Sequence, residues 1–158
     1  HTLSLHDALP ISAYSLSSSL LRVAGGRAAD IFTGEKVALF SFAAVIAGSI
    51  IMVLVAESFA LAFLGQMIMA LGMGFANAAV FKLVPRYTPA AVGGASGIVG
   101  GLGAFGGFVI PPAMGLFVAI SPVAGYSNGF AVFTILTVIA LGLLYVLYRY
   151  PPAEDKTL

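Results

Sequence analysis

The chain has 158 residues, of which 60% are hydrophobic and only 8% are charged, and its formal net charge at neutral pH is +1. A composition this apolar assigns the chain to the integral membrane proteins. Its seven basic residues are scattered, which argues against a nucleic-acid surface, and the absence of cysteine excludes disulfides, thiolate nucleophiles and cysteine-based metal sites.

The first dozen residues differ from the rest. Thr2 to Ile11 read TLSLHDALPI, which resembles a frame translation of a sequencing-library adaptor. We therefore expect residues 1–12 to be an artefact outside the fold, with the natural sequence beginning near Ser12, partway into a helix. The alternative is a genuine polar tail, although the segment lacks the basic start and long apolar run of a signal peptide. Both histidines of the chain fall here, so no metal centre is expected.

The next segment, residues 12–29, reads SAYSLSSSLLRVAGGRAA and is predicted to be the cytoplasmic end of a truncated span. Arg22 lies five residues before Arg27, which places it about 7.5 Å deeper along a helix. An arginine inside a membrane span is a candidate functional residue. The alternative is that Arg22 extends its side chain to the lipid headgroups.

Uncharged runs define the remaining spans. Residues 37–56 and 58–81 form runs of 20 and 24 residues, each long enough to cross a bilayer once. The 62 uncharged residues between Arg86 and Arg149 suffice for two crossings that turn at residues 121–128. The sequence therefore predicts an all-α, polytopic membrane helix bundle with four complete spans and one truncated span, at about 13–29, 37–56, 58–82, 91–120 and 127–149.

Basic residues lie at alternate ends of successive spans. The loops at the opposite ends contain no Lys or Arg. By the positive-inside rule the charged turns and the tail at residues 151–158 are cytoplasmic. The loops at Glu57 and at residues 121–128 are then expected to face outward.

Glycine is concentrated in the fourth predicted span. Residues 91–112, AVGGASGIVGGLGAFGGFVIPP, contain eight glycines and no charge, and glycine recurs every four residues within 93–101 and 103–107. Such strips let another backbone approach closely, so the span either packs tightly or lines a substrate path. Pro111 and Pro112 predict a kink.

The third predicted span carries a second strip of small residues, at Ala70, Gly74 and Ala78. Asn77 is its main polar group, and we expect Asn77 to hydrogen-bond across helices.

Residues 72–112, GMGFANAAVFKLVPRYTPAAVGGASGIVGGLGAFGGFVIPP, resemble the tenth helix, short loop and glycine-rich eleventh helix of the nitrate/nitrite porters of the major facilitator superfamily. Residues 19–30, SLLRVAGGRAAD, are similar to the end of the family's eighth helix, where an arginine before a Gly-Gly pair contacts the anion. The resemblance implies a partial C-terminal half of a twelve-helix transporter, in which the missing N-terminal half carries a second arginine and a first glycine signature.

The resemblance also implies a substrate site. Arg22 matches the anion-binding arginine, and its planar, forked guanidinium suits a planar oxyanion. Asn77 and the signature glycines are the other implied substrate-binding residues, although Ala76 and Ala78 stand where the family often has glycine. The glycines in question are Gly97, Gly100, Gly101, Gly103, Gly106 and Gly107.

The superfamily's loop pattern survives in part between the first two predicted spans. Gly26, Asp30, Gly34 and Lys36 match the pattern, and Asp30 and Gly34 are the implied gating residues. Glu35 departs from the pattern, as do Ile31 and an additional residue, which weakens a gating role.

The implied function is secondary active transport of nitrate or nitrite by alternating access, with the chain inactive alone. The implied partners are the anion, protons if coupling is by symport, the lipid bilayer and the missing half; no cofactor is implied. The implied location is a bacterial-type inner (plasma) membrane. An intramembrane protease would need a catalytic pair or metal motif that the spans lack. A small four-helix transporter or a structural subunit, working as an oligomer, remains the alternative.

Overall fold

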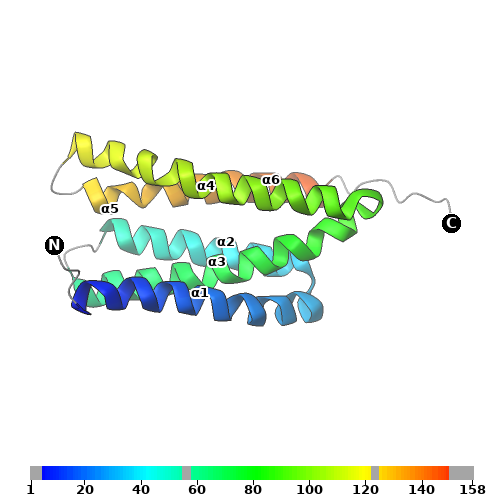
Figure 1. Ribbon diagram of the computed structural model, residues 1–158, viewed down its shortest axis with the longest axis horizontal. Helices are drawn as coiled ribbons and strands as arrows, with labels where there is room; N and C mark the ends of the chain where they lie inside the picture. Colours follow the sequence, from blue (N-terminus) through cyan, green and yellow to red (C-terminus); the bar gives the residue numbers. More distant parts are fainter. Residues whose placement is uncertain (1–4, 55–57, 122–124, 150–158) are drawn as a thin grey trace.

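The computed structural model describes residues 5–54, 58–121 and 125–149, which are almost wholly helical and contain no strand. Figure 1 shows the long helices side by side along the longest axis, with α1 at one edge and α4 at the opposite edge. The elements in chain order are α1 (Leu5–Phe32), α2 (Gly34–Leu54), α3 (Phe59–Tyr87), the short 3-10 helix η1 (Pro89–Ala91), α4 (Val92–Ile120), α5 (Gly125–Gly129) and α6 (Ala131–Arg149).

Four helical segments among the described residues are long and apolar enough to cross a membrane. Their mean hydropathies lie between 1.8 and 2.6, and they confirm the predicted all-α bundle with four complete spans. They are Gly34–Leu54, Phe59–Tyr87, Pro89–Ile120 and Gly125–Arg149.

The N-terminal boundary differs from the prediction. Helix α1 begins at Leu5 instead of residue 13, and it continues through Pro10 to Phe32. Leu9 and Ile11 extend the apolar, helix-forming composition of the segment that follows, so no break separates residues 5–12 from it. The adaptor origin of the first dozen residues stays a prediction.

One interior boundary also differs. Helix α3 passes through Pro85 and ends at Tyr87, beyond the predicted end at residue 82. The cap residue Thr88 donates its backbone N–H and its hydroxyl to the carbonyl of Val84, at 2.9 and 2.8 Å. Helix α4 ends at Ile120, as predicted, and contains Pro111 and Pro112, where a kink stays a prediction.

The predicted outer loop at residues 121–128 is partly the short helix α5. A Cβ on Gly125 would lie 2.4 Å from the Cα of Val118 and 2.5 Å from the carbonyl oxygen of Phe117, so only glycine fits this turn. Glu57 and the tail at residues 151–158 lie outside the described residues.

Helix α3 is central to the first part of the bundle, since it packs closely against both α1 and α2. The small buried core between these helices contains Ala29, Val37, Ala38 and Ala79. Helix α2 also packs against α6, and a hydrogen bond of 2.7 Å joins the hydroxyls of Ser49 and Thr134 there.

Glycine permits the closest helix contacts. Where α2 crosses α3, a Cβ on Gly48 would lie 2.6 Å from the carbonyl oxygen of Gly65, and one on Gly72 would lie 2.7 Å from that of Ser41. Where α1 meets α3, a Cβ on Gly25 would lie 2.7 Å from the Cα of Phe75. No larger residue fits these positions without moving a backbone.

Candidate functional site

Arg22 lies in the second half of α1, well before its last turns. It precedes the end of α1 at Phe32 by ten residues, or about 15 Å, which is half of the roughly 30 Å hydrocarbon thickness of a bilayer. Its side chain is exposed, and none of the ion pairs or hydrogen bonds among the described residues involves its guanidinium. A charge at this depth is costly unless it faces water, an anion or a polar partner, so the open face of α1 is a candidate binding surface.

Asn77 lies on the neighbouring helix at the same level. A Cβ on Gly74 would lie 3.3 Å from the backbone nitrogen of Arg22, and one on Gly25 would lie 3.3 Å from the Cβ of Ala78. These two contacts bracket Asn77, which is half-buried and ten residues before the end of α3. The fold therefore brings Arg22 and Asn77 to one depth on adjacent helices.

The predicted cross-helix hydrogen bond of Asn77 is not found among the described residues. The amide of Asn77 is thus available to another partner.

The signature glycines of α4 do not pack against another backbone of this chain. No atom lies within 4 Å of a Cβ built at Gly97, Gly101, Gly103 or Gly107, once the helix's own backbone is set aside. The same construction at Gly100 meets only the ring edge of Phe81, and at Gly106 only Ile110, each at 3.9 Å. No residue of α4 is buried. These glycines therefore do not serve tight helix packing within the described part of the chain.

The two groups of predicted site residues lie on separate helices. Helices α1 and α4 make no contact, and α3 lies against both. Gly103 is eleven residues into α4, or about 16 Å, so it reaches a depth similar to that of Arg22. The structure thus places Arg22, Asn77 and the middle of the glycine strip at comparable depths without bringing them together.

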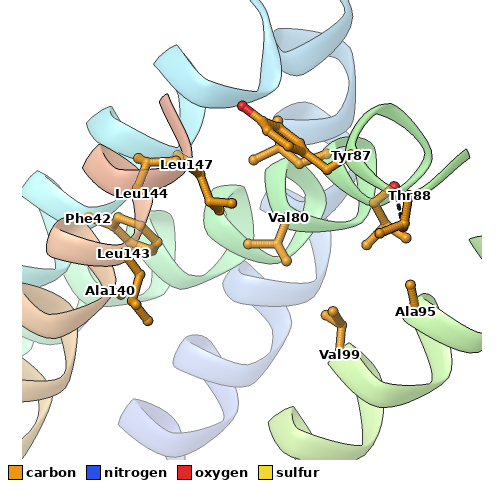
Figure 2. Close-up of a pocket in the computed structure, with 13 residues that line it drawn as sticks. Phe42, Val80, Tyr87, Thr88, Ala95, Val99, Ala140, Leu143, Leu144 and Leu147 are labelled. Atoms are coloured by element: carbon orange, nitrogen blue, oxygen red, sulfur yellow. Dashed lines mark hydrogen bonds between the residues drawn. The ribbon is translucent and has the colours of Figure 1, made fainter. Parts of the chain in front are cut away.

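A cavity of about 310 Å³ lies between α2, α3, α4 and α6, and Figure 2 shows its lining. Ala95 and Val99 of α4 line one side, and Leu143 and Leu147 of α6 line another. No charged residue lines this cavity. An oxyanion that loses its hydrating water needs charge-assisted hydrogen-bond donors instead, so this cavity is not suited to binding an oxyanion.

The predicted gating residues lie in a set of ion pairs at the end of the bundle where α1 turns into α2. Asp30 pairs with Lys82, and the carboxylate of Glu35 accepts hydrogen bonds from Arg86 at 2.9 Å and from the hydroxyl of Tyr87 at 3.2 Å. The turn between α1 and α2 is thereby attached to the end of α3.

Gly34 contributes to the same attachment by packing. A Cβ on Gly34 would lie 2.8 Å from a methyl carbon of Leu83 and 3.4 Å from the carbonyl oxygen of Ala79. Thr33, the single residue between α1 and α2, adopts φ of 82°, which is strained for a β-branched residue.

Sequence reasoning missed Glu35, Lys82 and Arg86 as partners. The available signal was their position, since charges of opposite sign stand at two turns that were predicted to share one side of the membrane. The pairs place both turns at the same end of the bundle.

The sequence model of the Major Facilitator Superfamily matches residues 3–158. The probable nitrate/nitrite antiporter NarK1 of Thermus thermophilus is 31% identical over 130 residues, covering 70% of this chain and 29% of that protein. The probable nitrate transporter NarT of Staphylococcus haemolyticus is 33% identical over 135 residues, covering 81% of this chain and 33% of that protein. The chain thus spans about a third of these relatives' length. No solved structure matches it significantly.

Proposed function

The chain belongs to the major facilitator superfamily, a family of transporters and not of enzymes, and we propose that it forms part of a porter for nitrate or nitrite in which Arg22 binds the anion. The relatives named for nitrate or nitrite transport support the substrate class. The observation that carries the proposal is the exposed guanidinium of Arg22, which is unpaired among the described residues and lies about 15 Å from the end of α1.

Arg22 is chemically suited to this role. Nitrate and nitrite are planar oxyanions, and a guanidinium offers them two parallel N–H donors with a charge that persists at every physiological pH. The amide of Asn77, at the same depth on α3, offers a further N–H donor. The anion would thus lie beside α1 and α3, outside the apolar cavity of Figure 2.

The glycine strip of α4 is proposed to border the same path. A small anion needs a narrow route, and helix backbone without side chains can border such a route closely. Gly97, Gly101, Gly103 and Gly107 leave that face of α4 open in this chain.

The open faces of α1 and α4 are proposed to meet a second set of helices, the N-terminal half of the transporter. Exposed apolar residues on α4, among them Ile98, Leu102 and Phe108, offer it a contact surface. Substrate in such transporters is held near the midplane between two halves, and transport proceeds by rocking of one half against the other.

The turn with Asp30 and Gly34 is proposed to act as a gating element. Its ion pairs with the end of α3 hold α1, α2 and α3 together at one end, so that this end moves as a unit. By the positive-inside rule this end and the C-terminus are cytoplasmic in a bacterial-type plasma membrane. Protons are coupling partners if transport is by symport.

The test is nitrate uptake by proteoliposomes that contain this chain joined to the upstream half encoded in the source genome. Arg22→Lys keeps the charge but removes the fork, so uptake should fall at least tenfold. Arg27→Lys is the matched control, since Arg27 is also an exposed arginine of α1 but lies near the loop end, and its uptake should be unchanged. Equal uptake by the Arg22→Lys variant and the parent protein would refute the assignment of Arg22.

The 158-residue chain alone should give no uptake above empty vesicles, because its anion-binding faces are then open to lipid. Uptake by that chain would instead favour the alternative of a small transporter working as an oligomer.

A further inference from the structure

We propose that a groove between the start of α2 and the end of α6 binds a phospholipid with an anionic headgroup, whose phosphate pairs with Lys36. The groove has a volume of about 300 Å³, and we call it the Lys36 groove. Besides Lys36, its lining includes Leu39, Leu141, Leu144, Tyr145 and Tyr148. It is separate from the proposed anion path, since neither α1 nor α4 contributes to its lining.

The lining matches the chemistry of a phospholipid. Lys36 is the third residue of α2, so it lies at the end of the groove nearest the membrane surface, where a headgroup phosphate would be. Leu39 of α2 and Leu141 of α6 lie about one to two turns further in and offer apolar contact to an acyl chain. A free phosphate ion would make no use of that apolar surface, which favours the lipid.

The two tyrosines support the same depth. Tyr145 and Tyr148 lie in the last turns of α6 and are exposed, at 65% and 73%. Amphipathic rings of this kind favour the level of the headgroups, where the ring contacts chains and the hydroxyl contacts polar groups. Figure 1 shows that the start of α2 and the end of α6 lie at the same end of the bundle.

The free charge of the groove is positive. Glu35 also lines it, but its side chain is only 12% exposed and its carboxylate is held by Arg86 and Tyr87. Lys36 is exposed, and none of the ion pairs among the described residues includes it. A basic pocket between membrane helices on the cytoplasmic side is a recognised setting for anionic headgroups.

The sequence contains no tryptophan, so Tyr148→Trp creates a single fluorescent reporter in the groove. The reporter chain is reconstituted in phosphatidylcholine vesicles that contain a small, equal fraction of brominated phosphatidylglycerol or brominated phosphatidylcholine, since bromine quenches tryptophan on contact. The anionic lipid should associate about fivefold more strongly than the zwitterionic one, the preference that one Lys near a membrane surface provides.

Lys36→Gln in the reporter chain should abolish that preference. Arg27→Gln is the matched control, because it removes one exposed cation from the same end of the bundle outside the groove, and it should keep the preference. Equal quenching by the two lipids would overturn the proposal. An equal loss of the lipid preference in Lys36→Gln and Arg27→Gln would also overturn it. That result would mean that the overall positive charge at this end of the bundle attracts the lipid without a specific site.

A second measurement does not depend on the reporter. Native mass spectrometry is applied to the unmodified chain, to Lys36→Gln and to Arg27→Gln. The unmodified chain and Arg27→Gln should each retain one phosphatidylglycerol, and Lys36→Gln should retain none. Retention of that lipid by Lys36→Gln would again overturn the proposal. Neither readout involves nitrate, so failure here leaves the proposed transport function untouched.

Discussion

Gly48 and Gly65 face each other where α2 crosses α3, so closely that a Cβ on Gly48 would lie 2.6 Å from the carbonyl oxygen of Gly65. A Cβ on Gly65 would in turn lie 3.1 Å from the carbonyl oxygen of Gly48. The two backbones are therefore in direct contact. In lipid there is no hydrophobic force between helices, so such contact is a main source of helix association.

Gly48→Ala is expected to destabilise the chain by about 1–3 kcal/mol, because the added methyl meets backbone atoms that cannot rotate away. The measurement is unfolding in detergent by increasing SDS, followed by circular dichroism. Gly97→Ala is the control, since a Cβ there meets nothing within 4 Å, and its stability should match that of the parent chain. Equal stability of Gly48→Ala and the parent chain would contradict the observed crossing.

Gly103→Leu should leave the SDS unfolding midpoint of the chain unchanged, because the Cβ position on α4 is open. In the chain joined to the proposed upstream half, the same change should abolish the proposed nitrate uptake, because the leucine would fill the proposed path. Gly142→Leu is the comparison, since Gly142 of α6 is equally open but lies outside α4, and uptake should persist. Full uptake by Gly103→Leu would argue against a path along this strip.

Arg86 and Glu35 should couple more strongly than Lys82 and Asp30. The Glu35 side chain is 12% exposed, whereas the Lys82 and Asp30 side chains are 48% and 58% exposed. Exposed pairs contribute about 0.2–1 kcal/mol, so we expect the Arg86–Glu35 pair near the top of this range and the other near the bottom.

Double-mutant cycles with Arg86→Gln and Glu35→Gln, and with Lys82→Gln and Asp30→Asn, measure the two couplings. Repeating both cycles in 1 M salt should remove the Lys82–Asp30 coupling first, since water and ions reach that pair most freely. A larger coupling energy for Lys82–Asp30 than for Arg86–Glu35 would contradict the expectation drawn from the burial of Glu35.

Thr33→Asn should stabilise the chain by about 1 kcal/mol. Thr33 has φ of 82°, and this left-handed conformation costs most residues about 1–2 kcal/mol, whereas asparagine tolerates it. Thr33→Val keeps the β-branch and should not stabilise, which separates backbone strain from any effect of the hydroxyl. The readout is again the SDS unfolding midpoint, and a loss of stability in Thr33→Asn would show that the strain is offset by a contact of threonine.

Much of the fold followed from the sequence because the bilayer imposes a length. Uncharged runs of 20 residues or more had to cross it, and the described helices contain four such crossings. The charges at residues 30–36 and 82–86 marked two turns at one end, and the ion pairs Asp30–Lys82 and Glu35–Arg86 join those turns. The glycine pattern and Arg22 also indicated the family, to which the chain belongs.

What the sequence left open was which faces meet. Eight glycines drew attention to residues 91–112, yet no residue of α4 is buried, and the close crossing of α2 and α3 involves the isolated glycines Gly48, Gly65 and Gly72. A glycine permits close approach but does not require it, because the rotation of each helix is set by all its neighbours at once. Spacing along the chain therefore determined the spans and their ends, and only the tertiary structure decided which strips became interfaces and left Arg22 on an open face.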